Sequence, residues 1–536
     1  MTGPVERVAA MARSHPREPA IFDVRETGTT VWTWSELERA SERIAALLAR
    51  LGVCEGEAVA YQLANRAEFI AITLAILRRG AICCPLMPIF RERELEDLIG
   101  RARVRVLFLA ADYRGRRPAD EIAAVEPRLP HLEHVLVLGS ASATPLPRSA
   151  RVTWNWLDDA LAGDTMSARG GAPAPARLAQ LLFTSGTSGE PKGVLHRLDT
   201  LTKAVELEIE HLGLGPRDRI YIPSPLAHQT GFLYGMWLAL SLGVPAIVQE
   251  TWNARRGLAA LSAAGGTFVQ AATPFLADLL DAVEAGEAPP RTLRLFVATG
   301  AAVPRTLARR ATQLLGTAVC GAFGTTEGCL ATLSSPGDSP EKAWGTDGRP
   351  LCSIELRICD DDGRVLGAGE EGHFETHSPT MLEGYLDHPD WTAAAYTPDG
   401  WYRTGDLALI DAEGFLHVTG RVKDVINRGG EKIPIAEIEQ LLHQHDAVKE
   451  VAIVAMPDPR LGERACAFVV PRAGGDTLDF PSMQRFLDER RVAKPYWPER
   501  LEIVEALPRT PSGKIQKYRL RERARTLAPT RGTDRA

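Results

Sequence analysis

The stretch LLFTSGTSGEPKGVLH, residues 181–196, decides how the rest of the chain is interpreted. An apolar run ends at Thr184 and leads into a loop of glycine and hydroxyl side chains that closes on Lys192. Glycines let a backbone approach a bulky ligand with its N–H groups pointing inward. Hydroxyl groups donate to phosphate oxygens, and a lysine adds a positive charge. The stretch therefore predicts a phosphate-binding loop that follows a buried strand.

This loop differs from the phosphate loop of the P-loop NTPases. Counted from Gly186, that pattern places Gly before the lysine and Ser or Thr after it, whereas this chain has Pro191 and Gly193. A flexible Ser/Gly linker is the alternative, but such a linker would not follow an apolar strand directly. The candidate phosphate-binding residues are Thr184, Ser185, Gly186, Thr187, Ser188, Gly189 and Lys192.

Composition excludes several classes of protein. The chain has 536 residues, 45% hydrophobic and 24% charged, as in an average globular protein. Its 62 basic and 68 acidic residues give a net charge of −6, which argues against a broadly basic nucleic-acid binder.

The eight cysteines lack a zinc-site spacing and suggest a reducing cytosol, so we expect a cytoplasmic protein. We expect no signal peptide, and no apolar stretch reaches the about 20 residues of a membrane span.

The pattern of elements predicts an α/β fold. Over the first third of the chain, strand and helix patterns alternate, which indicates a large N-terminal domain of sheets covered by helices. Ser35 and Glu38 have the spacing of a capping box at the start of one helix. Short strands and D-D-G, P-D-G and A-E-G turns predict a β-rich subdomain over about 345–422. From Val425 the mixed pattern returns and predicts a small C-terminal α+β domain.

Further motifs follow the loop along the chain. GAFGTTEG, residues 321–328, and GWYRTGDLALID, residues 400–411, combine glycines with acidic residues. PRTPSGKIQK, residues 508–517, places Lys514 in a turn after a strand. VATGAAVP, residues 297–304, is a weaker signal, because an ordinary strand-to-helix turn explains it equally well. Each motif alone is compatible with a solvated turn, so the order of the motifs carries the interpretation.

In this order the motifs closely resemble those of the AMP-forming adenylating enzymes, which comprise acyl-CoA synthetases, carrier-protein adenylation domains and luciferases. The resemblance spans nearly the whole chain. Ser188 and Phe323 depart from the Thr and Tyr usual in the family, and Pro434 lies one place earlier than the usual Pro. The resemblance implies a large adenylating domain, residues 1–422, and a small mobile lid domain, residues 423–536, with a hinge at Lys423.

The resemblance also implies a role for individual residues. Lys514 is the leading catalytic residue, bridging the attacking carboxylate and the α-phosphate of ATP. Thr326 contacts the α-phosphate, while Glu327 and Thr184 hold Mg²⁺. Asp406 contacts the ribose, and Arg421 is a second contact to the ribose or to a phosphate. Gly429 and Gly430 form a turn beside the thiol donor. The implied nucleotide- and cofactor-binding set is completed by Gly300, Ala301, Ala302, Phe323, Gly324 and Thr325.

PSPLAHQTGFLYGMW, residues 223–237, resembles the segment that forms the acyl pocket in this family. His228 takes the gating position and is a catalytic candidate, although a core histidine is an equally good interpretation. Around it, Leu226, Phe232 and Trp237 favour an apolar acyl group. The segment therefore indicates an apolar acid, whereas the resemblance of residues 427–432 and 491–517 to one branch of the family implies a medium-chain, alicyclic or aromatic acid.

The chain is most similar to CoA ligases for medium-chain, alicyclic or aryl acids. This resemblance implies activation of an apolar carboxylic acid by ATP to acyl-AMP with pyrophosphate release, followed by transfer to CoA, with Mg²⁺ as the metal. One alternative is a stand-alone adenylation enzyme that loads an acyl or aryl carrier protein. Another is a non-catalytic nucleotide-binding homologue. We expect no nucleic-acid partner, and both a monomer and a homodimer stay open.

Overall fold

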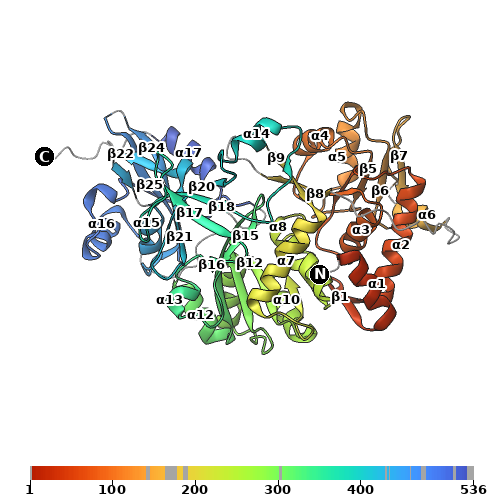
Figure 1. Ribbon diagram of the computed structural model, residues 1–536, viewed down its shortest axis with the longest axis horizontal. Coiled ribbons are helices and arrows are strands. Elements are labelled where there is room, and N and C mark those ends of the chain that lie inside the picture. Colours follow the sequence, from red (N-terminus) through yellow and green to blue (C-terminus); the bar gives the residue numbers. More distant parts are fainter. Residues whose placement is uncertain are drawn as a thin grey trace.

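The computed structural model describes residues 3–139, 145–162, 178–184, 191–300, 305–428, 431–433, 435–458, 460–472, 478–510 and 515–527. The chain runs from an N-terminal half at one end of the molecule to a C-terminal domain at the other (Figure 1). Four sheets organise it, two large and two small.

The first large sheet has nine strands, and its central part is parallel. Their order is β16 (Arg349–Pro350), β15 (Cys329–Leu333), β14 (Ala318–Thr325), β13 (Leu295–Thr299), β12 (Phe268–Ala272), β10 (Ile220–Ile222), β11 (Ala246–Gln249), β1 (Pro19–Arg25) and β2 (Gly28–Thr33). Parallel strands need crossover connections, and three of these carry α10 (Ala254–Ala264), α11 (Thr273–Glu284) and α12 (Arg305–Leu315). The α/β class predicted from the strand–helix alternation is confirmed.

The second large sheet has eight strands and carries the predicted phosphate loop at one side. Their order is β19 (Gly384–Tyr385), β9 (Lys192–Arg197), β8 (Leu178–Thr184), β4 (Ile82–Leu86), β3 (Ala58–Gln62), β5 (Val106–Leu109), β6 (His134–Val137) and β7 (Thr153–Trp156). The helices of this half are α1 (Pro4–Ser14), α2 (Trp34–Arg50), α3 (Ala67–Arg78), α4 (Glu92–Arg101), α5 (Pro118–Val125), α6 (Leu157–Ala162) and α7 (Leu198–Leu212).

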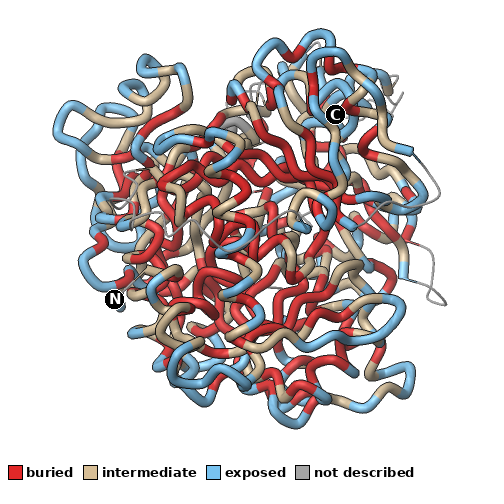
Figure 2. Tube along the Cα trace, turned by 90° about the vertical axis from the view of Figure 1, so that its right-hand side faces the viewer, coloured by how far each residue is buried: buried red, intermediate tan, exposed pale blue. Residues whose placement is uncertain are grey.

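The largest core joins the two large sheets through α3. Every residue from 69 to 77 in this helix is buried, which fits a helix that is apolar on all sides and enclosed by its neighbours. Its side chains share one cluster with residues of β1, β3 and β10. Figure 2 shows the buried residues gathered in the interior of the molecule, with most exposed residues toward its outside. The two sheets therefore form one rigid base for the loops at their edges.

The predicted capping box at α2 is wrong by two residues. Helix α2 begins at Trp34, and its N-cap is Thr33, whose hydroxyl accepts from the Glu36 amide at 3.3 Å. Glu36 accepts in turn from the Thr33 amide at 2.8 Å. Glu38 is unavailable for capping because its carboxylate pairs with Arg78 on α3. Tertiary contact thus decided between two overlapping capping patterns.

The β-rich subdomain is confirmed as an antiparallel sheet of four strands. It comprises β17 (Glu355–Cys359), β18 (Gly372–His377), β20 (Tyr402–Ile410) and β21 (Leu416–Arg421). The C-terminal domain combines β22 (Ile426–Arg428), β23 (Glu431–Ile433), β24 (Val448–Asp458), β25 (Gly462–Pro471) and β26 (Arg500–Ile503) with α15 (Ile435–Leu442), α16 (Phe480–Glu489) and α17 (Lys517–Thr526). The exact boundary at 422 and the hinge at Lys423 stay predictions.

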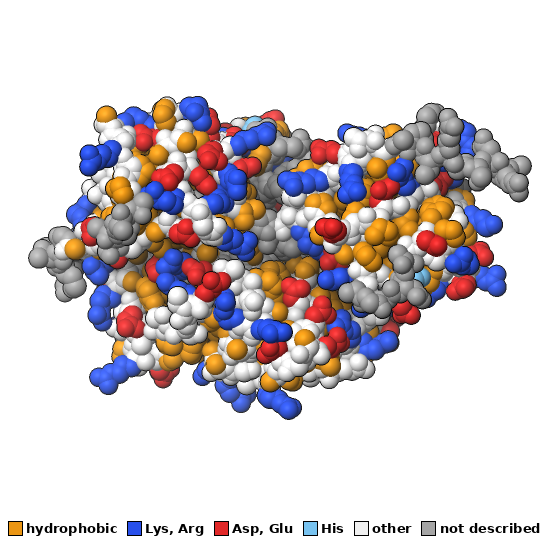
Figure 3. All heavy atoms as spheres, turned by 180° about the vertical axis from the view of Figure 1, so that it is seen from behind, with side chains coloured by type: hydrophobic (Ala, Val, Ile, Leu, Met, Phe, Trp, Pro, Cys, Tyr) orange, Lys and Arg blue, Asp and Glu red, His pale blue; other side chains and the backbone are white. Residues whose placement is uncertain are grey.

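The surface carries charges of both signs, and the cysteines form no disulfide. Acidic and basic side chains are interspersed over the face seen in Figure 3. All eight cysteines are free thiols, and six of them are buried. Within the described ranges, no helix combines the length and the apolarity that crossing a membrane requires.

Asp347 connects the β-rich subdomain to the large domain. Its carboxylate accepts from the Val418 amide at 2.8 Å, and its own amide donates to the Leu416 carbonyl at 2.8 Å. Burial raises the pKa of the Asp347 carboxyl to about 6, against the lowering effect of the Val418 hydrogen bond and of His417. The carboxyl is therefore easier to bury when it is protonated.

We predict that Asp347→Asn stabilises the protein at pH 8. Above pH 6 the folded state must ionise a carboxyl that the unfolded chain ionises near pH 4, at a cost of up to about 3 kcal/mol. Below about pH 4 both states hold the proton, so the advantage of the variant should disappear. Thermal unfolding midpoints at pH 8 and pH 4 check this. The exposed Asp362→Asn is the control, and an advantage that persists at pH 4 would contradict the explanation.

Candidate active site

The predicted phosphate loop lies between two antiparallel strands of the second sheet. Thr184 ends β8 and Lys192 begins β9, and the two residues are register partners. Residues Ser185, Gly186, Thr187, Ser188 and Gly189 lie outside the described residues. The two anchors of the loop are thus placed side by side, with the Thr184 hydroxyl 3.5 Å from the Lys192 carbonyl oxygen.

Aromatic rings surround the ammonium group of Lys192. Its Nζ atom lies 4.6 Å from the centre of the Tyr385 ring and 5.6 Å from that of Trp391. Both rings come from the segment of β19 and α14 (Pro389–Ala394), which Figure 1 shows beside β8 and β9. The electron-rich face of an aromatic ring attracts a cation, so these contacts hold the ammonium group without neutralising it.

The GTTEG block lies in the turn between β14 and β15. Thr325 Oγ1 accepts from the Gly328 amide at 2.9 Å and closes this turn. Glu327 Oε1 accepts from the Tyr385 hydroxyl at 3.0 Å. Tyr385 therefore contacts both Lys192 of the phosphate loop and Glu327, the predicted metal ligand. Sequence reasoning missed Tyr385, because nothing in its local pattern connects it to either motif.

His196 is a second contact between the phosphate-loop strand and the GTTEG block. It is fully buried, and its Nε2–H donates to the Thr326 carbonyl at 2.7 Å. Burial lowers the pKa of His196 to about 4, so the ring is neutral at physiological pH. A signal was present in the sequence, because residues 192, 194 and 196 of a strand point to the same face.

Phe323 is connected to Asp406 through two residues of the four-stranded sheet. The Phe323 ring packs edge-to-face on Phe374 of β18, with 5.2 Å between ring centres. Thr404 donates its hydroxyl to the Phe374 carbonyl at 2.8 Å and accepts from the Asp406 amide at 3.1 Å. The aromatic residue predicted near adenine and the carboxylate predicted near ribose are therefore separated by a short chain of contacts.

Asp406 and Arg421 pair with each other. They are register partners on β20 and β21, and Arg421 Nε donates to Asp406 Oδ1 at 2.9 Å. The Asp406 side chain is 3% exposed, whereas that of Arg421 is 40% exposed. The arginine thus gives a nearly buried carboxylate a charge-assisted hydrogen bond while part of its own side chain is exposed to solvent.

His228 stands at the entrance to a buried helical segment. It is the N-cap of the short α8 (Gln229–Gly231), and the Thr230 amide donates to its Nδ1 at 3.3 Å. The chain then continues as a π-helical turn over Phe232–Trp237, whose residues are all buried, and as α9 (Leu238–Leu242). The predicted acyl-pocket segment is therefore core structure, and its polar atoms Gln229 Oε1 and Trp237 Nε1 find no hydrogen-bond partner among the described residues.

The remaining predicted site residues fall into two groups, those that the structure describes and those that it does not. Gly300 lies directly after β13 with φ of +84°, a conformation that favours glycine. Gly324 lies in β14 beside Phe323. The others fall outside the described residues: Ala301, Ala302, Gly429, Gly430 and Lys514. The site geometry above therefore rests on the large domain.

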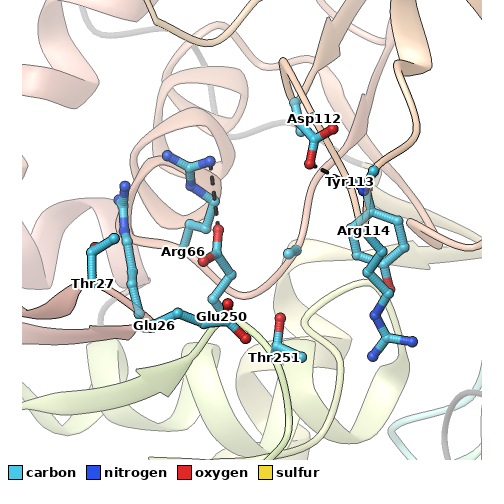
Figure 4. Close-up of a pocket in the computed structure, with 12 residues that line it drawn as sticks. Glu26, Thr27, Arg66, Asp112, Tyr113, Arg114, Glu250 and Thr251 are labelled. Atoms are coloured by element: carbon cyan, nitrogen blue, oxygen red, sulfur yellow. Dashed lines mark hydrogen bonds and ion pairs between the residues drawn. The ribbon is translucent and has the colours of Figure 1, made fainter.

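A separate cavity of about 430 Å³ lies where loops at the ends of β1, β3, β5 and β11 meet. Figure 4 shows Arg66 pointing toward Glu250 on one wall, with Asp112, Tyr113 and Arg114 on the other. The Arg66–Glu250 pair spans 3.7 Å. None of the sequence-predicted site residues lines this cavity.

Comparisons with known proteins agree with this arrangement of motifs. The AMP-binding enzyme family matches residues 8–386, and the AMP-binding enzyme C-terminal domain matches residues 437–514. The medium-chain fatty-acid–CoA ligase of Escherichia coli (strain K12) is 34% identical over 511 residues, which cover 95% of this chain and 88% of that protein. The salicyl-AMP ligase / salicyl-S-ArCP synthetase of Mycobacterium tuberculosis (strain ATCC 25618 / H37Rv) is 34% identical, with 94% and 88% covered.

A solved structure extends the agreement to three dimensions. ATP-bound MatB from Rhodopseudomonas palustris superposes with a TM-score of 0.84 at 26% identity, over 98% of this chain and 99% of that one. The chain therefore belongs to the AMP-binding enzyme family and is an AMP-forming ligase of the adenylating superfamily.

Proposed function

We propose that this protein activates an apolar carboxylic acid, medium-chain, alicyclic or aromatic, and transfers it to CoA. In the first half-reaction the carboxylate attacks the α-phosphorus of ATP, forming acyl-AMP and releasing pyrophosphate. In the second, a thiol attacks the activated carbonyl and AMP leaves. One observation carries the proposal: Lys192 and Glu327, from motifs 135 residues apart, contact the same side chain, Tyr385.

The residues around the nucleotide act by positioning and by charge. In this proposal the Lys192 ammonium group binds the phosphates, and the Asp406 carboxylate accepts hydrogen bonds from the ribose hydroxyls. Arg421, already held by Asp406, adds a second contact at the ribose. No covalent protein nucleophile is needed, because the substrate carboxylate itself is the attacking group.

The carboxylate of Glu327 suits a magnesium ion that is shared with ATP. The described residues contain no cluster of three or more metal-binding side chains. Mg²⁺ is commonly held by one or two carboxylates together with substrate phosphates, so a single glutamate beside a phosphate loop fits this donor set. When bound, the ion would offset the negative charge that develops on the leaving pyrophosphate.

The segment around His228 supports an apolar acid. The turn Phe232–Trp237 is buried throughout, and Leu226 and Ala227 before it are also buried. A binding site next to this buried apolar turn favours an apolar acyl group. The E. coli relative, a medium-chain fatty-acid–CoA ligase, points to the same class of acid.

A panel of acids tests the proposal. We expect ATP–pyrophosphate exchange with medium-chain, alicyclic or aromatic acids, and a CoA thioester of the same acid by mass spectrometry. Short dicarboxylic acids and amino acids serve as controls and should give little exchange. An absence of exchange with every acid would instead favour the non-catalytic homologue.

A carrier protein is the second candidate for the thiol acceptor. The M. tuberculosis relative is named a salicyl-AMP ligase / salicyl-S-ArCP synthetase, which supports a carrier-bound thiol as the alternative to free CoA. The two acceptors are separated by supplying free CoA and a carrier bearing the phosphopantetheine arm in parallel. Acyl transfer to the carrier alone would replace CoA in the proposal.

We predict that Lys192→Met weakens ATP binding by about tenfold or more, because hydrogen bonds to a charged donor are lost. The Michaelis constant for ATP in the exchange reaction measures this effect. Lys203→Met removes a half-exposed lysine on α7 and is the matched control. An unchanged constant in the Lys192 variant would contradict the assigned role.

The two half-reactions are proposed to use two orientations of the C-terminal domain, rotated about Lys423. One presents Lys514 for adenylation, and the other presents the Gly429–Gly430 turn for thiol transfer. We predict that Lys514→Ala abolishes acyl-adenylate formation but spares thioester formation from supplied acyl-adenylate. Lys517→Ala, a neighbour paired with Glu439 at 2.7 Å, is the control. Equal loss in both half-reactions would contradict the two-orientation mechanism.

A further inference from the structure

A single segment, residues 380–392, holds the two nucleotide motifs together. On one side, the Leu382 amide donates to the Glu327 carbonyl at 2.7 Å, and the Thr380 hydroxyl donates to the Gly328 carbonyl at 2.8 Å. On the other side, β19 pairs antiparallel with β9, with Tyr385 opposite Val194. The backbones of the GTTEG block and of the phosphate-loop strand are therefore both bonded to this segment.

The Tyr385 side chain repeats this bridge with charged groups. Its ring faces the Lys192 ammonium at 4.6 Å, and its hydroxyl donates to Glu327 Oε1 at 3.0 Å. The residue is 5% exposed, and its amide donates to Thr392 Oγ1 at 2.9 Å. Two different parts of one rigid side chain thus engage a cation and an anion at the same time.

Tyr385 is itself held in place by its neighbours. Trp391 meets its ring edge-to-face at 6.4 Å and stacks on His388 at 3.6 Å. Tyr385 also shares a buried cluster with Val194, Leu382 and Tyr402. A tyrosine enclosed in this way has little rotational freedom, so it can fix the positions of the groups that it contacts.

Lys192 and Glu327 carry opposite charges and contact the same tyrosine, one at its ring and the other at its hydroxyl, yet they form no ion pair. No carboxylate lies within 4.0 Å of the Lys192 ammonium in the part of the chain that the structure describes. A direct pair would neutralise both groups and would have to break before a phosphate could bind. The ring and the hydroxyl of Tyr385 give each group an alternative partner that leaves its charge intact.

We propose that Tyr385 is a positioning residue that keeps Lys192 and Glu327 apart, so that both are ready for the nucleotide. The inference rests on the proposed function, because it assumes that these two groups bind the phosphates and their metal. It assigns Tyr385 no contact with substrate. Its effect is to prevent the two charges from neutralising each other in the empty site.

A double-mutant cycle tests this role by nucleotide binding alone. We would measure the dissociation constant of α,β-methylene-ATP by isothermal titration calorimetry, with EDTA present so that no metal contributes. Tyr385→Leu should weaken binding about tenfold, because Lys192 becomes free to pair with Glu327. In the Glu327→Gln background that pair cannot form. The same substitution should then cost about threefold at most, from the lost cation–π contact.

Tyr385→Phe covers the case in which the leucine variant fails to fold. It keeps the ring and removes only the hydroxyl that anchors Glu327. Its penalty should appear in the wild-type background and vanish in the Glu327→Gln background. Tyr396→Phe, in the same aromatic cluster but without contact to either charged group, should leave binding unchanged. Thermal unfolding midpoints confirm that each variant is folded.

Three outcomes would overturn the inference. Equal penalties in both backgrounds would show that Tyr385 acts only as packing, while the proposed function would stand. An unaltered affinity in both Tyr385 variants would show that Tyr385 has no effect on nucleotide binding, and the proposed function would again stand. A wild-type protein that binds no nucleotide would instead overturn the proposed function, and this inference with it.

Discussion

The arrangement of the site depends on one short backbone pairing, that of β19 with β9. It attaches residues 384 and 385 to the strand that begins at Lys192, and the same segment reaches the Glu327 carbonyl. In the proposed site a lysine binds the phosphates and a nearby glutamate binds their metal, and opposite charges so placed tend to neutralise each other. The pairing places an aromatic residue where it can satisfy both, so that the charges stay available.

The four-stranded sheet carries the two residues that we propose for the nucleoside end of the ligand. Asp406 and Arg421 are register partners there, and the sheet also carries Phe374, on which Phe323 packs. Asp347 connects this sheet to the large domain by a carboxyl that burial penalises when it is ionised. The contact that attaches this sheet to the large domain therefore carries an electrostatic cost whenever the Asp347 carboxyl is ionised.

Local patterns predicted much of the fold, and they failed where two patterns overlapped. The strand–helix alternation and the turn-rich region after residue 345 predicted the α/β class and the β-rich subdomain, because periodicity and turn residues act over short distances. The capping box at Ser35 was wrong, since Thr33 and Glu36 offered the same chemistry and Glu38 had a tertiary partner in Arg78. The roles of Asp406 and Lys514 stay predictions.

What the sequence by itself determined is a set of motifs and its family: a loop of glycines, hydroxyls and a lysine, a turn that holds Glu327, and a strand that holds Asp406, in an order typical of one family. Only the tertiary structure decided which side chains hold these groups in place. His196 bonds to Thr326 across 130 residues, and Tyr385 lies 193 residues after Lys192. The Tyr385 contact arises from the pairing of β19 with β9, and the His196 contact arises from the packing of β9 against the turn between β14 and β15. Neither leaves a local pattern, because each residue fits its own segment equally well without the partner.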